Sequence, residues 1–323
     1  MIPVSRSNSQ SFDVVTIGSS NQDLVIRVPH IPVAGETILG NQSGLFLGGK
    51  GANQAVAAMR GGGRVLFITK VGKDLFGQNM MTHFYREGFP AEGILVDSNE
   101  LTGMAQIWVA ESGENAITVA PGANSKLLPA DLEEFTESIR LSGVVLMQLE
   151  IPMETVSRAV ELAWQGGVKV ILNPAPAQLL NPDLLRRVWL LTPNESEATL
   201  LTGVRVDGVE SAKKAGQKLL QQGVQNVIIT LGERGSVFCH GKGSRHFDAY
   251  QVEAVDSTAA GDVFNGFVAV AIASGKNLED AIPFASAAAA LSVGRPGAQV
   301  SIPTFDEVHQ FMKAQEASGI FSN

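Results

Sequence analysis

Cysteine is almost absent from this sequence of 323 residues, which holds a single one, Cys239. One cysteine cannot form an intrachain disulfide, and Cys239 belongs to no cluster of Cys and His residues typical of a zinc site. Residues 1–11 are polar and lack the apolar stretch of a secretory signal peptide, so we interpret them as a short leader. Together these observations predict a protein of a reducing compartment, the cytoplasm.

Charged residues are also scarce, at 17% of the chain, and 24 basic residues are outnumbered by 32 acidic ones. The net charge of −8 and the pI near 5.2 argue against a nucleic-acid-binding protein, whose binding face is normally basic. No uncharged apolar run reaches the roughly 18 residues of a transmembrane helix, so no membrane partner is predicted. Apolar residues make up 45% of the chain, which is enough for a large core.

Short runs of β-branched residues alternate with longer helical patterns along the chain. Strands are predicted at 12–18, 65–71, 144–149, 168–172, 188–192 and 226–231. Helices are predicted at 51–60, 77–87, 152–165, 194–202, 208–222, 260–274, 278–293 and 304–315. Several strands are apolar throughout, as expected where helices cover both faces of a sheet. The pattern predicts an α/β fold with a mainly parallel central sheet, in a single domain over 12–323.

Two stretches interrupt this alternation, at about 22–47 and 101–120. Each holds strand-like segments without a helix, and the second is typical of a hairpin with the turn ESGEN. We interpret both as insertions that form a small sheet over the ligand crevice, a lid. Its apolar residues Ile107, Trp108 and Val109 would need a cover, either a substrate or another subunit.

The segment DSTAAGD at 256–262 precedes an apolar helical run, so a helix is predicted to begin near Ala260. A helix N-terminus offers unpaired N–H groups and a positive dipole end, which together bind anions. Asp262 in the first turn would lie beside that anion and could accept a hydroxyl proton during phosphoryl transfer. A purely structural interpretation stays open: Asp262 would only be stabilised by the positive end of the helix dipole, and Asp256 would cap the helix.

The segment GGKGANQAVAAM at 48–59 combines glycines, which permit close backbone approach, with a helix that follows. Lys50 and Asn53 could point into a crevice. GLFLGGK at 44–50 matches the first part of a P-loop, but Gly51 stands where the magnesium-binding Ser or Thr belongs, which argues against one. The segment IGSSNQD after the first strand has one glycine and is no dinucleotide fingerprint, so a nicotinamide-dependent dehydrogenase has no support.

Polar residues also follow two predicted strands. Asn21 and Asp23 come after the first strand and could bind vicinal hydroxyls, because a carboxylate accepts hydrogen bonds and an amide both donates and accepts them. A simple polar turn fits the same residues equally well. Glu150 directly follows the strand predicted at 144–149.

Two further segments follow strands in the second half of the chain. TPNESEATLLTG at 192–203 places Asn194 at a helix start, with Glu195 and Glu197 in the first turn. Favourable placement at the helix dipole explains these acids, and water-mediated magnesium binding is the functional alternative. TLGERG at 230–235 fits either a nucleotide loop or an ordinary hairpin turn.

In this order, these motifs resemble the ribokinase family of carbohydrate kinases, also called the phosphofructokinase B family. The resemblance covers about 12–315 and rests on GSSNQD, GETILGN, GGKGANQAVAA, VGKDLFG, PGAN, MQLE, LNPAPA, TPNESEATLLTG, ITLGERG, AVDSTAAGDVFNG and GRPGAQVSIP. GGKGANQ and DSTAAGD, which lie far apart in the chain, are highly specific as a pair. The resemblance implies a three-layer α/β sandwich with a mainly parallel sheet and a small β-sheet lid.

The activity that the resemblance implies is transfer of the γ-phosphoryl group of ATP to the O5 hydroxyl of D-ribose, with Mg²⁺ required and K⁺ as an activator. Asp262 would be the catalytic base, and the N–H groups of Ala259, Ala260 and Gly261 would form the anion hole. Many relatives have glycine at the position of Ala259. A backbone N–H survives this difference, so we expect activity to be kept.

The resemblance also implies binding residues. The sugar would contact Asn21, Asp23, Gly49, Lys50, Asn53, Glu150 and Asp262. ATP would contact Asn194, Glu197, Thr230, Gly232, Gly235, Ala260 and Gly261, and the first two of these would organise magnesium and phosphate. Potassium would lie among Asp256, Thr258, Ser292, Arg295, Gly297 and Ser301, several of them through backbone carbonyls.

The identity of the sugar rests on Asn21 and Asp23, which together suit a substrate with both 2- and 3-hydroxyls and so favour D-ribose over 2-deoxyribose. A kinase of the same family for 2-deoxyribose, another sugar or a nucleoside is the alternative. In a different class, the fold could serve a non-catalytic sugar or nucleotide sensor. The resemblance also implies that the lid sheets of two subunits pair, so a homodimer is expected, with Ala105 and Ile107 reaching the sugar pocket.

Overall fold

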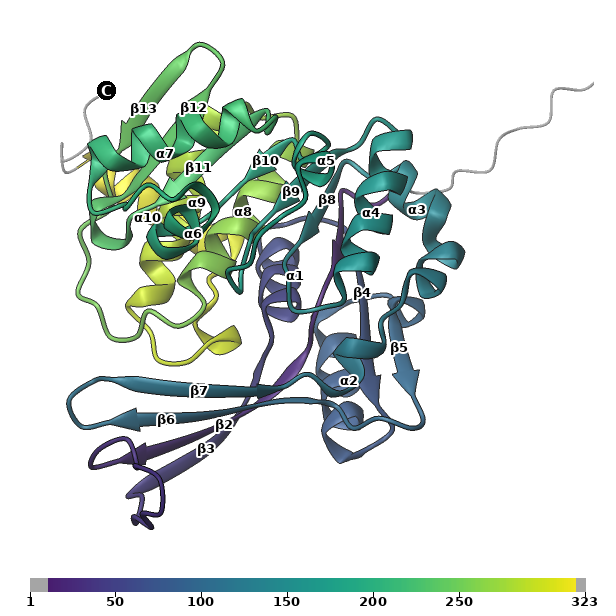
Figure 1. The fold of residues 1–323 in the computed structure, drawn as a ribbon, viewed down its shortest axis with the longest axis vertical. Coiled ribbons are helices and arrows are strands. Elements are labelled where there is room, and N and C mark those ends of the chain that lie inside the picture. Colours follow the sequence, from purple (N-terminus) through teal and green to yellow (C-terminus); the bar gives the residue numbers. More distant parts are fainter. Residues whose placement is uncertain (1–10, 318–323) are drawn as a thin grey trace, which may run out of the picture.

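A nine-stranded sheet forms the centre of the computed structural model, which describes residues 11–317 (Figure 1). Its strand order is β13-β12-β11-β10-β9-β8-β1-β4-β5. The strands are β1 Val14–Ile17, β4 Val65–Gly72, β5 Ile94–Asp97, β8 Val144–Met147, β9 Lys169–Leu172, β10 Leu190–Leu191, β11 Asn226–Thr230, β12 Ser236–His240 and β13 Gly243–Phe247. All neighbours from β5 to β11 pair in parallel, and only β12 and β13 are antiparallel. The leader predicted at 1–11 lies outside the described residues except for Ser11.

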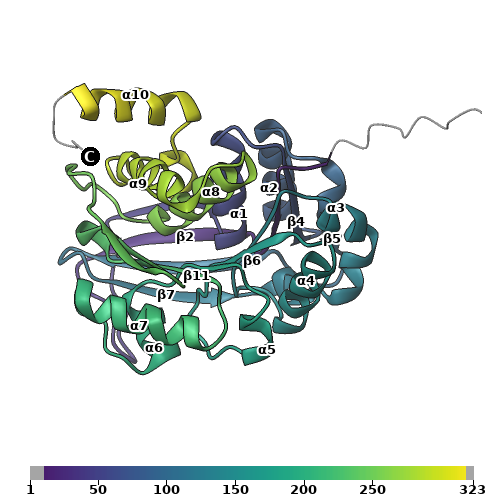
Figure 2. The same ribbon diagram turned by 90° about the horizontal axis from the view of Figure 1, so that it is seen from above.

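Helices cover both faces of this sheet (Figure 2). On one face lie α1 Lys50–Arg60, α2 Leu75–Glu87, α8 Ala260–Ala273, α9 Leu278–Val293 and, outside α9, α10 Phe305–Ala317. On the other lie α3 Thr136–Arg140, α4 Met153–Gln165, α5 Pro182–Leu185, α6 Glu195–Thr202 and α7 Val209–Gln221. Within 11–317, no helix has the length and apolar character needed to cross a bilayer. The predicted three-layer sandwich is confirmed. The bounds of 12–323 for a single domain stay a prediction.

The alternation of side chains along the central strands divides the core into two clusters. Val14 and Phe67 pack with α1, α8 and α9 in one cluster. Val15 and Ile68 pack with α4 and α7 in the other. The central strands are therefore apolar on both faces, which is why their sequence lacks the alternation of a half-exposed strand.

A second sheet of four strands, called the small sheet here, projects from one end of the central sheet (Figure 1). Its order is β3-β2-β6-β7, from β2 Asn21–Val28, β3 Gln42–Gly48, β6 Gly103–Ala110 and β7 Asn115–Ala120. β2 and β6 pair in parallel, and the outer pairs are antiparallel. The two predicted insertions thus form one sheet. Because β3 belongs to it, the GLFLGGK segment does not follow a core strand as a P-loop would.

Three strands of the central sheet were not predicted, β5, β12 and β13. β5 has only four residues, and β13 has the polar sequence GSRHF at the sheet edge, so neither shows a buried-strand pattern. The TLGERG segment is the turn of the hairpin that β12 forms with β11, where Gly232–Arg234 make one turn of 3-10 helix. Four further 3-10 turns are Ala91–Gly93, Gly122–Lys126, Pro129–Phe135 and Gln299–Ser301.

Candidate active site

Two glycines let the start of α1 touch the end of β1. A Cβ on Gly51 would lie 2.4 Å from the carbonyl carbon of Gly18 and from the nitrogen of Ser19, so no larger residue fits there. Gly49 adopts a left-handed backbone with φ 89°, a region in which glycine is unstrained. The start of α1 thereby lies against the start of β2, since a Cβ on Gly49 would lie 2.7 Å from the nitrogen of Asn21.

Asp262 lies at the centre of the site, in the first turn of α8, and its side chain is 6% exposed. Its Oδ2 accepts a hydrogen bond from Asn53 Nδ2 at 3.0 Å, and its Oδ1 accepts one from Gln54 Nε2 at 2.9 Å. Burial raises the pKa of Asp262, while the Lys50 ammonium and the two amide donors oppose this. The raised pKa makes Asp262 a better proton acceptor than an exposed carboxylate.

Two more carboxylates share the single ammonium of Lys50 with Asp262. Burial, together with Glu150 and Asp262, raises the pKa of Asp23 to about 7, although Lys50 opposes the shift. The Asp262 carboxylate has the largest effect on Lys50 and raises its pKa. Burial opposes this rise, and Glu150 adds to it. Glu150 Oε2 accepts hydrogen bonds from Ser19 Oγ at 2.6 Å and from the backbone nitrogen of Lys50 at 3.0 Å. Such a set of acceptors and one cation can bind a polyhydroxylated ligand.

Asn21 is held in one orientation by Asn124. The backbone of Ser20 fixes the Asn124 amide from both sides, donating to Oδ1 at 2.9 Å and accepting from Nδ2 at 3.1 Å. Asn124 Nδ2 also donates to Asn21 Oδ1 at 2.8 Å. The Nδ2 group of Asn21 is therefore left to donate to a ligand. Gly103 has no room for a Cβ, which would lie 2.4 Å from Asn21 Oδ1.

The N-terminus of α8 begins at Ala260, as predicted. Ala259 precedes it with φ 61° and ψ 7°, and it is the one non-glycine residue among 11–317 with a positive φ. In that described part of the chain, the backbone N–H groups of Ala259 and Gly261 have no acceptor, whereas Ala260 donates to Ser257 at 3.2 Å. Two of the three predicted anion-hole N–H groups are thus available to an anion beside Asp262.

Asp256 does not cap α8, so the structural interpretation of that residue is wrong. Its Oδ1 accepts from the backbone nitrogen of Thr258 and its Oδ2 from that of Gly297, each at 2.9 Å. These bonds join the segment before α8 to the segment after α9. Burial opposes them, but the bonds from Thr258 and Gly297 lower the pKa of Asp256.

The remaining residues predicted at the potassium site lie in the last turn of α9, at Ser292, or after that helix, and they have other partners as well. Arg295 Nη2 pairs with Glu307 Oε1 at 2.6 Å, and the Arg295 nitrogen donates to the Ser292 carbonyl. Ser301 Oγ donates to the Ala298 carbonyl at 2.7 Å. Only the backbone carbonyl of Arg295 suits a cation, since its side chain is itself cationic.

Asn194 and Glu197 cap α6 reciprocally. Asn194 Oδ1 accepts from the nitrogen of Glu197, and Glu197 Oε2 accepts from the nitrogen of Asn194, both at 2.9 Å. Glu197 is buried, which raises its pKa, although the Asn194 N–H opposes the shift. Asn194 also forms an isolated parallel bridge with Thr230. The start of α6 and the TLGERG turn are therefore side by side.

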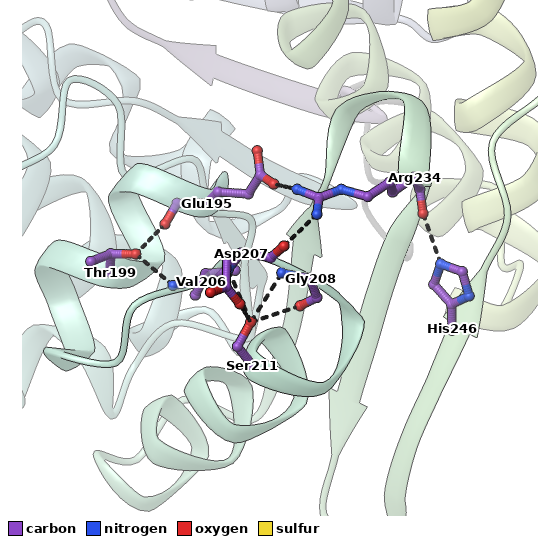
Figure 3. A network of polar contacts seen from close by, with 8 residues as sticks. All are labelled: Glu195, Thr199, Val206, Asp207, Gly208, Ser211, Arg234 and His246. Atoms are coloured by element: carbon purple, nitrogen blue, oxygen red, sulfur yellow. Dashed lines mark hydrogen bonds and ion pairs between the residues drawn. The ribbon is translucent and has the colours of Figure 1, made fainter.

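A polar network joins these two segments (Figure 3). The Arg234 guanidinium contacts the Glu195 carboxylate and the Asp207 carbonyl, and a ring nitrogen of His246 lies 2.7 Å from the Arg234 carbonyl. Ser211 Oγ accepts from the backbone nitrogen of Asp207 at 3.0 Å. The network fixes the turn that carries Gly232 and Gly235 relative to α6.

Several buried polar residues of the site had no predicted role: Ser19, Gln54, Asn124, Gln148, Asn173, Thr192 and Asn265. All seven stand inside motifs of the resemblance, namely GSSNQD, GGKGANQAVAA, PGAN, MQLE, LNPAPA, TPNESEATLLTG and AVDSTAAGDVFNG, and these motifs are the signal that could have found them. Their roles depend on contacts between segments distant in the chain, which spacing does not reveal.

Comparisons with known proteins identify the family of this chain. The model of the pfkB family carbohydrate kinases matches residues 11–305. Ribokinase of Haemophilus influenzae is 46% identical over 301 residues, which cover 93% of this chain and 98% of that protein. Deoxyribokinase of Salmonella typhi is 34% identical over 306 residues, covering 94% and 100%.

Solved structures show the same likeness. Arabidopsis thaliana ribokinase complexed with ribose and ATP matches with a TM-score of 0.88 at 31% identity, over 94% of this chain and 99% of that one. Ribokinase of Thermotoga maritima matches with a TM-score of 0.85 at 39% identity, over 93% and 99%. The chain thus has the fold of known ribokinase structures.

Proposed function

Since the chain belongs to the pfkB family of carbohydrate kinases and has the ribokinase-like fold, we propose that it transfers the γ-phosphoryl group of ATP to the O5 hydroxyl of D-ribose. The observation that carries this proposal is the buried carboxylate of Asp262, which lies beside free N–H groups of α8 and is bonded to Asn53 of the GGKGANQ motif. Relatives named ribokinase, 46% and 40% identical, support ribose as the sugar.

In the proposed reaction, Asp262 accepts the proton of the O5 hydroxyl. The O5 oxygen then bonds to the γ-phosphorus while the bond from that phosphorus to the β,γ-bridging oxygen breaks, which releases ADP. The N–H groups of Ala259 and Gly261, with that of Ala260, stabilise the charge on the transferring group. The small sheet acts as a lid that excludes water from the site.

The sugar site is proposed at Asn21, Asp23, Gly49, Lys50, Asn53 and Glu150. Asn53 supports this placement, because its Oδ1 is buried and has no hydrogen-bond partner among the described residues. A buried acceptor without a partner destabilises a protein by about 1–3 kcal/mol, so a ligand hydroxyl is its natural donor. The amide of Asn21 and the carboxylate of Asp23 would bond the 2- and 3-hydroxyls.

ATP is proposed to bind across the start of α6 and the TLGERG turn, at Asn194, Glu197, Thr230, Gly232 and Gly235. The bridge between Asn194 and Thr230 supports this, because it holds the two segments together. Gly232, with φ 59° and no atom near its Cβ position, leaves the turn backbone open to a nucleotide. Gly235, with φ 79°, instead makes room for the Phe247 carbonyl, which would lie 2.0 Å from a Cβ. The Arabidopsis thaliana ribokinase is complexed with ribose and ATP, which supports ATP as the nucleotide.

Magnesium is proposed to enter with ATP. In residues 11–317 no group of three or more His, Cys, Asp or Glu side chains is arranged to hold a metal, and both Glu197 oxygens already accept bonds from Asn194. This fits an ion that keeps several waters and binds mainly phosphate oxygens, with Glu197 facing it through water. The ion would neutralise charge on the phosphates.

Potassium is proposed to lie between the two segments that Asp256 joins. The oxygen-rich set of Asp256, Thr258, Ser292, Arg295, Gly297 and Ser301 is of the type that binds hard cations. The bonds from Asp256 to Thr258 and Gly297 support the proposal, because they bring both segments next to the N-terminus of α8. A cation there would order the anion hole.

A homodimer through the small sheets is proposed from the exposed apolar residues of one face. Asp23 pairs with Phe46 and Ala105, and Ala105 pairs with Val119, so these side chains share the face toward the sugar site. Ala105 is buried and Ile107 is half-buried. The exposed positions are instead Phe46 at 40%, Ile117 at 56% and Val119 at 45%. A partner would cover them in the cytoplasmic enzyme.

The test is ATP-to-ADP turnover with Mg²⁺ and a panel of D-ribose, 2-deoxyribose, fructose and adenosine, each with K⁺ or with tetramethylammonium as the control cation. We expect ribose to be preferred and K⁺ to stimulate. The second candidate substrate is 2-deoxyribose, because a relative that is 34% identical is named deoxyribokinase. A preference for 2-deoxyribose would mean that the roles assigned to Asn21 and Asp23 are wrong. No turnover, with ribose and ATP still binding by calorimetry, would indicate a sensor.

A further inference from the structure

A chain of three buried amide side chains ends at Asp262, and we infer that it fixes the orientation of this carboxylate, with Gln54 as the positioning residue. Gln148 Nε2 donates to Gln54 Oε1 at 2.6 Å, and Gln54 Nε2 donates to Asp262 Oδ1 at 2.9 Å. Gln54 Nε2 also donates to Asn173 Oδ1 at 3.2 Å. Both glutamines are fully buried. The inference rests on the proposed function, in which Asp262 is the base.

The direction of every amide in this chain is determined by a backbone carbonyl. Asn173 Nδ2 donates to the Thr192 carbonyl at 3.0 Å, and a carbonyl only accepts. The Oδ1 atom of Asn173 must therefore face Gln54. If Gln54 were flipped, its Oε1 would face the oxygens of both Asn173 and Asp262, with no hydrogen between them. Gln54 thus has a single favourable orientation, with both of its N–H groups used.

Both ends of the chain are also constrained. A Cβ on Gly18 would lie 2.8 Å from the Gly51 Cα and 2.1 Å from Gln148 Oε1, so the glycine leaves room for the Gln148 amide, whose buried Oε1 has no hydrogen-bond partner among the described residues. Thr192 Oγ1 donates to Asn265 Oδ1 at 2.6 Å, and Asn265 Nδ2 donates to the Gly261 carbonyl at 2.8 Å. Asp262 and the first turn of α8 are therefore both positioned relative to Thr192, which precedes the proposed ATP site.

Loss of the Gln54 donor has two consequences for Asp262. The carboxylate keeps only the bond from Asn53 to Oδ2 and can rotate about it, which misaligns the proton acceptor. Its pKa also rises, because a hydrogen bond to the charged form lowers the pKa. The charged groups that face Asp262 are Lys50, Asp23, Glu150 and Glu197, and they are unchanged by a substitution at Gln54.

The experiment is Gln54→Met, which keeps the length of the side chain and removes both donors. We expect kcat to fall by about tenfold to about a hundredfold, with KM for ribose and ATP changed by less than about threefold. The acidic limb of the pH profile of kcat should move to higher pH. Gln217→Met, on the exposed side of α7, is the matched control and should leave all three unchanged.

A second readout separates this inference from the proposed function. The ¹³C carboxyl resonance of Asp262, assigned with Asp262→Asn, should titrate at higher pH in Gln54→Met whatever the sugar is. If the wild-type protein does not phosphorylate ribose but the Asp262 resonance still titrates at higher pH in Gln54→Met, the ribose kinase is refuted and the positioning role is supported. Wild-type turnover on ribose, with kcat within twofold and titration unmoved in Gln54→Met, would overturn the positioning role. If Gln54→Met does not fold, Gln148→Met should show the same changes at smaller size, and an unchanged pH profile there would overturn it.

Discussion

Asn53 and Asp262, 209 residues apart in the chain, are joined by a hydrogen bond of 3.0 Å from Nδ2 to Oδ2. The bond connects the two motifs whose combination was most specific in the sequence. A cap or a packing role for either motif does not require this contact, whereas a shared ligand site does. Asn53 keeps its buried Oδ1 without a partner in the described chain, so one end of its amide is bound to the Asp262 carboxylate and the other is left for the proposed sugar.

Asp262→Asn should remove the proton acceptor while the fold is kept. The amide has nearly the same volume, so we expect a melting temperature within a few degrees of wild type and a fall in kcat of more than about a hundredfold. Steady-state turnover with ribose and calorimetric ATP binding check this, and ATP affinity should be unchanged. A folded variant with near-normal turnover would show that another group takes the proton.

Asn21→Ala should narrow the preference for ribose over 2-deoxyribose. Asn124 Nδ2 fixes Asn21 Oδ1, which leaves the Nδ2 group of Asn21 to donate to a sugar hydroxyl. The variant loses this contact with ribose, whereas its interaction with 2-deoxyribose, which lacks the 2-hydroxyl, is weakened less. We therefore expect the ratio of kcat/KM for ribose to kcat/KM for 2-deoxyribose to fall by about tenfold. Competition assays with both sugars measure it. An unchanged ratio would place recognition of the 2-hydroxyl elsewhere.

Asp23→Asn should stabilise the protein at neutral and alkaline pH. Burial raises the pKa of Asp23 from 3.8 to about 7, so between these values the native state binds more protons than the unfolded chain. Wild-type stability therefore falls as pH rises from about 4 to about 7, and the variant lacks this contribution.

We expect the melting temperature of Asp23→Asn to exceed that of wild type by roughly 4 °C at pH 8 and to match it near pH 4. Calorimetry at three pH values between these limits follows the difference. Asp248→Asn, at an exposed carboxylate, serves as the control. Equal melting curves at pH 8 would contradict a raised pKa for Asp23. Ribose binding by the variant should be weak.

The central strands and most helices could be predicted because their apolar patterns are local. β1, β8 and β11 are buried on both faces, and this leaves continuous apolar runs in the sequence. β13 could not be predicted, since it is a polar edge strand that forms only because β12 pairs with it. Its structure depends on a partner and not on its own residues.

Site residues could be predicted from the sequence where a motif carries them, but their states could not. The pKa of Asp23 depends on Glu150 and Asp262, which distant segments bring to it. The role of Gln54 depends on Asn173 and on a carbonyl of the next strand. Such properties arise from the packing of α1 against β1 and α8, and no local pattern encodes them.

Ala259→Gly should leave catalysis unchanged. Ala259 has φ 61°, a left-handed conformation that is unfavourable for a residue with a Cβ and free for glycine. The gain is offset in part by the greater entropy of glycine in the unfolded chain, so stability should rise by at most about 1 kcal/mol. Turnover should stay within about twofold, because the backbone N–H is retained.

Ala259→Val is the contrasting variant at the same position. A β-branched residue is strongly disfavoured at positive φ, so we expect a loss of about 1–3 kcal/mol in the free energy of unfolding and a clear fall in kcat as the N–H groups move. Urea unfolding and turnover assays measure both. Equal activity of the two variants would mean that the backbone at 259 does not shape the anion site.

Ile117→Asp should separate the subunits of the proposed dimer. The side chain is 56% exposed in one chain and shares a face with Phe46, Val119 and Asp23, so a dimer through this face would bury the new charge without a partner. Thr118→Asp is the matched control, because its side chain points to the opposite face of the same strand. Sedimentation velocity at about 10 μM should show Ile117→Asp as a monomer and Thr118→Asp as a dimer, since a buried, unpaired carboxylate disfavours an interface by several kcal/mol.

Loss of the partner should also raise KM for ribose, because the sugar-side residues of the small sheet would lose their cover. A monomeric wild type would refute the dimer, and a dimeric Ile117→Asp would place the interface on another surface.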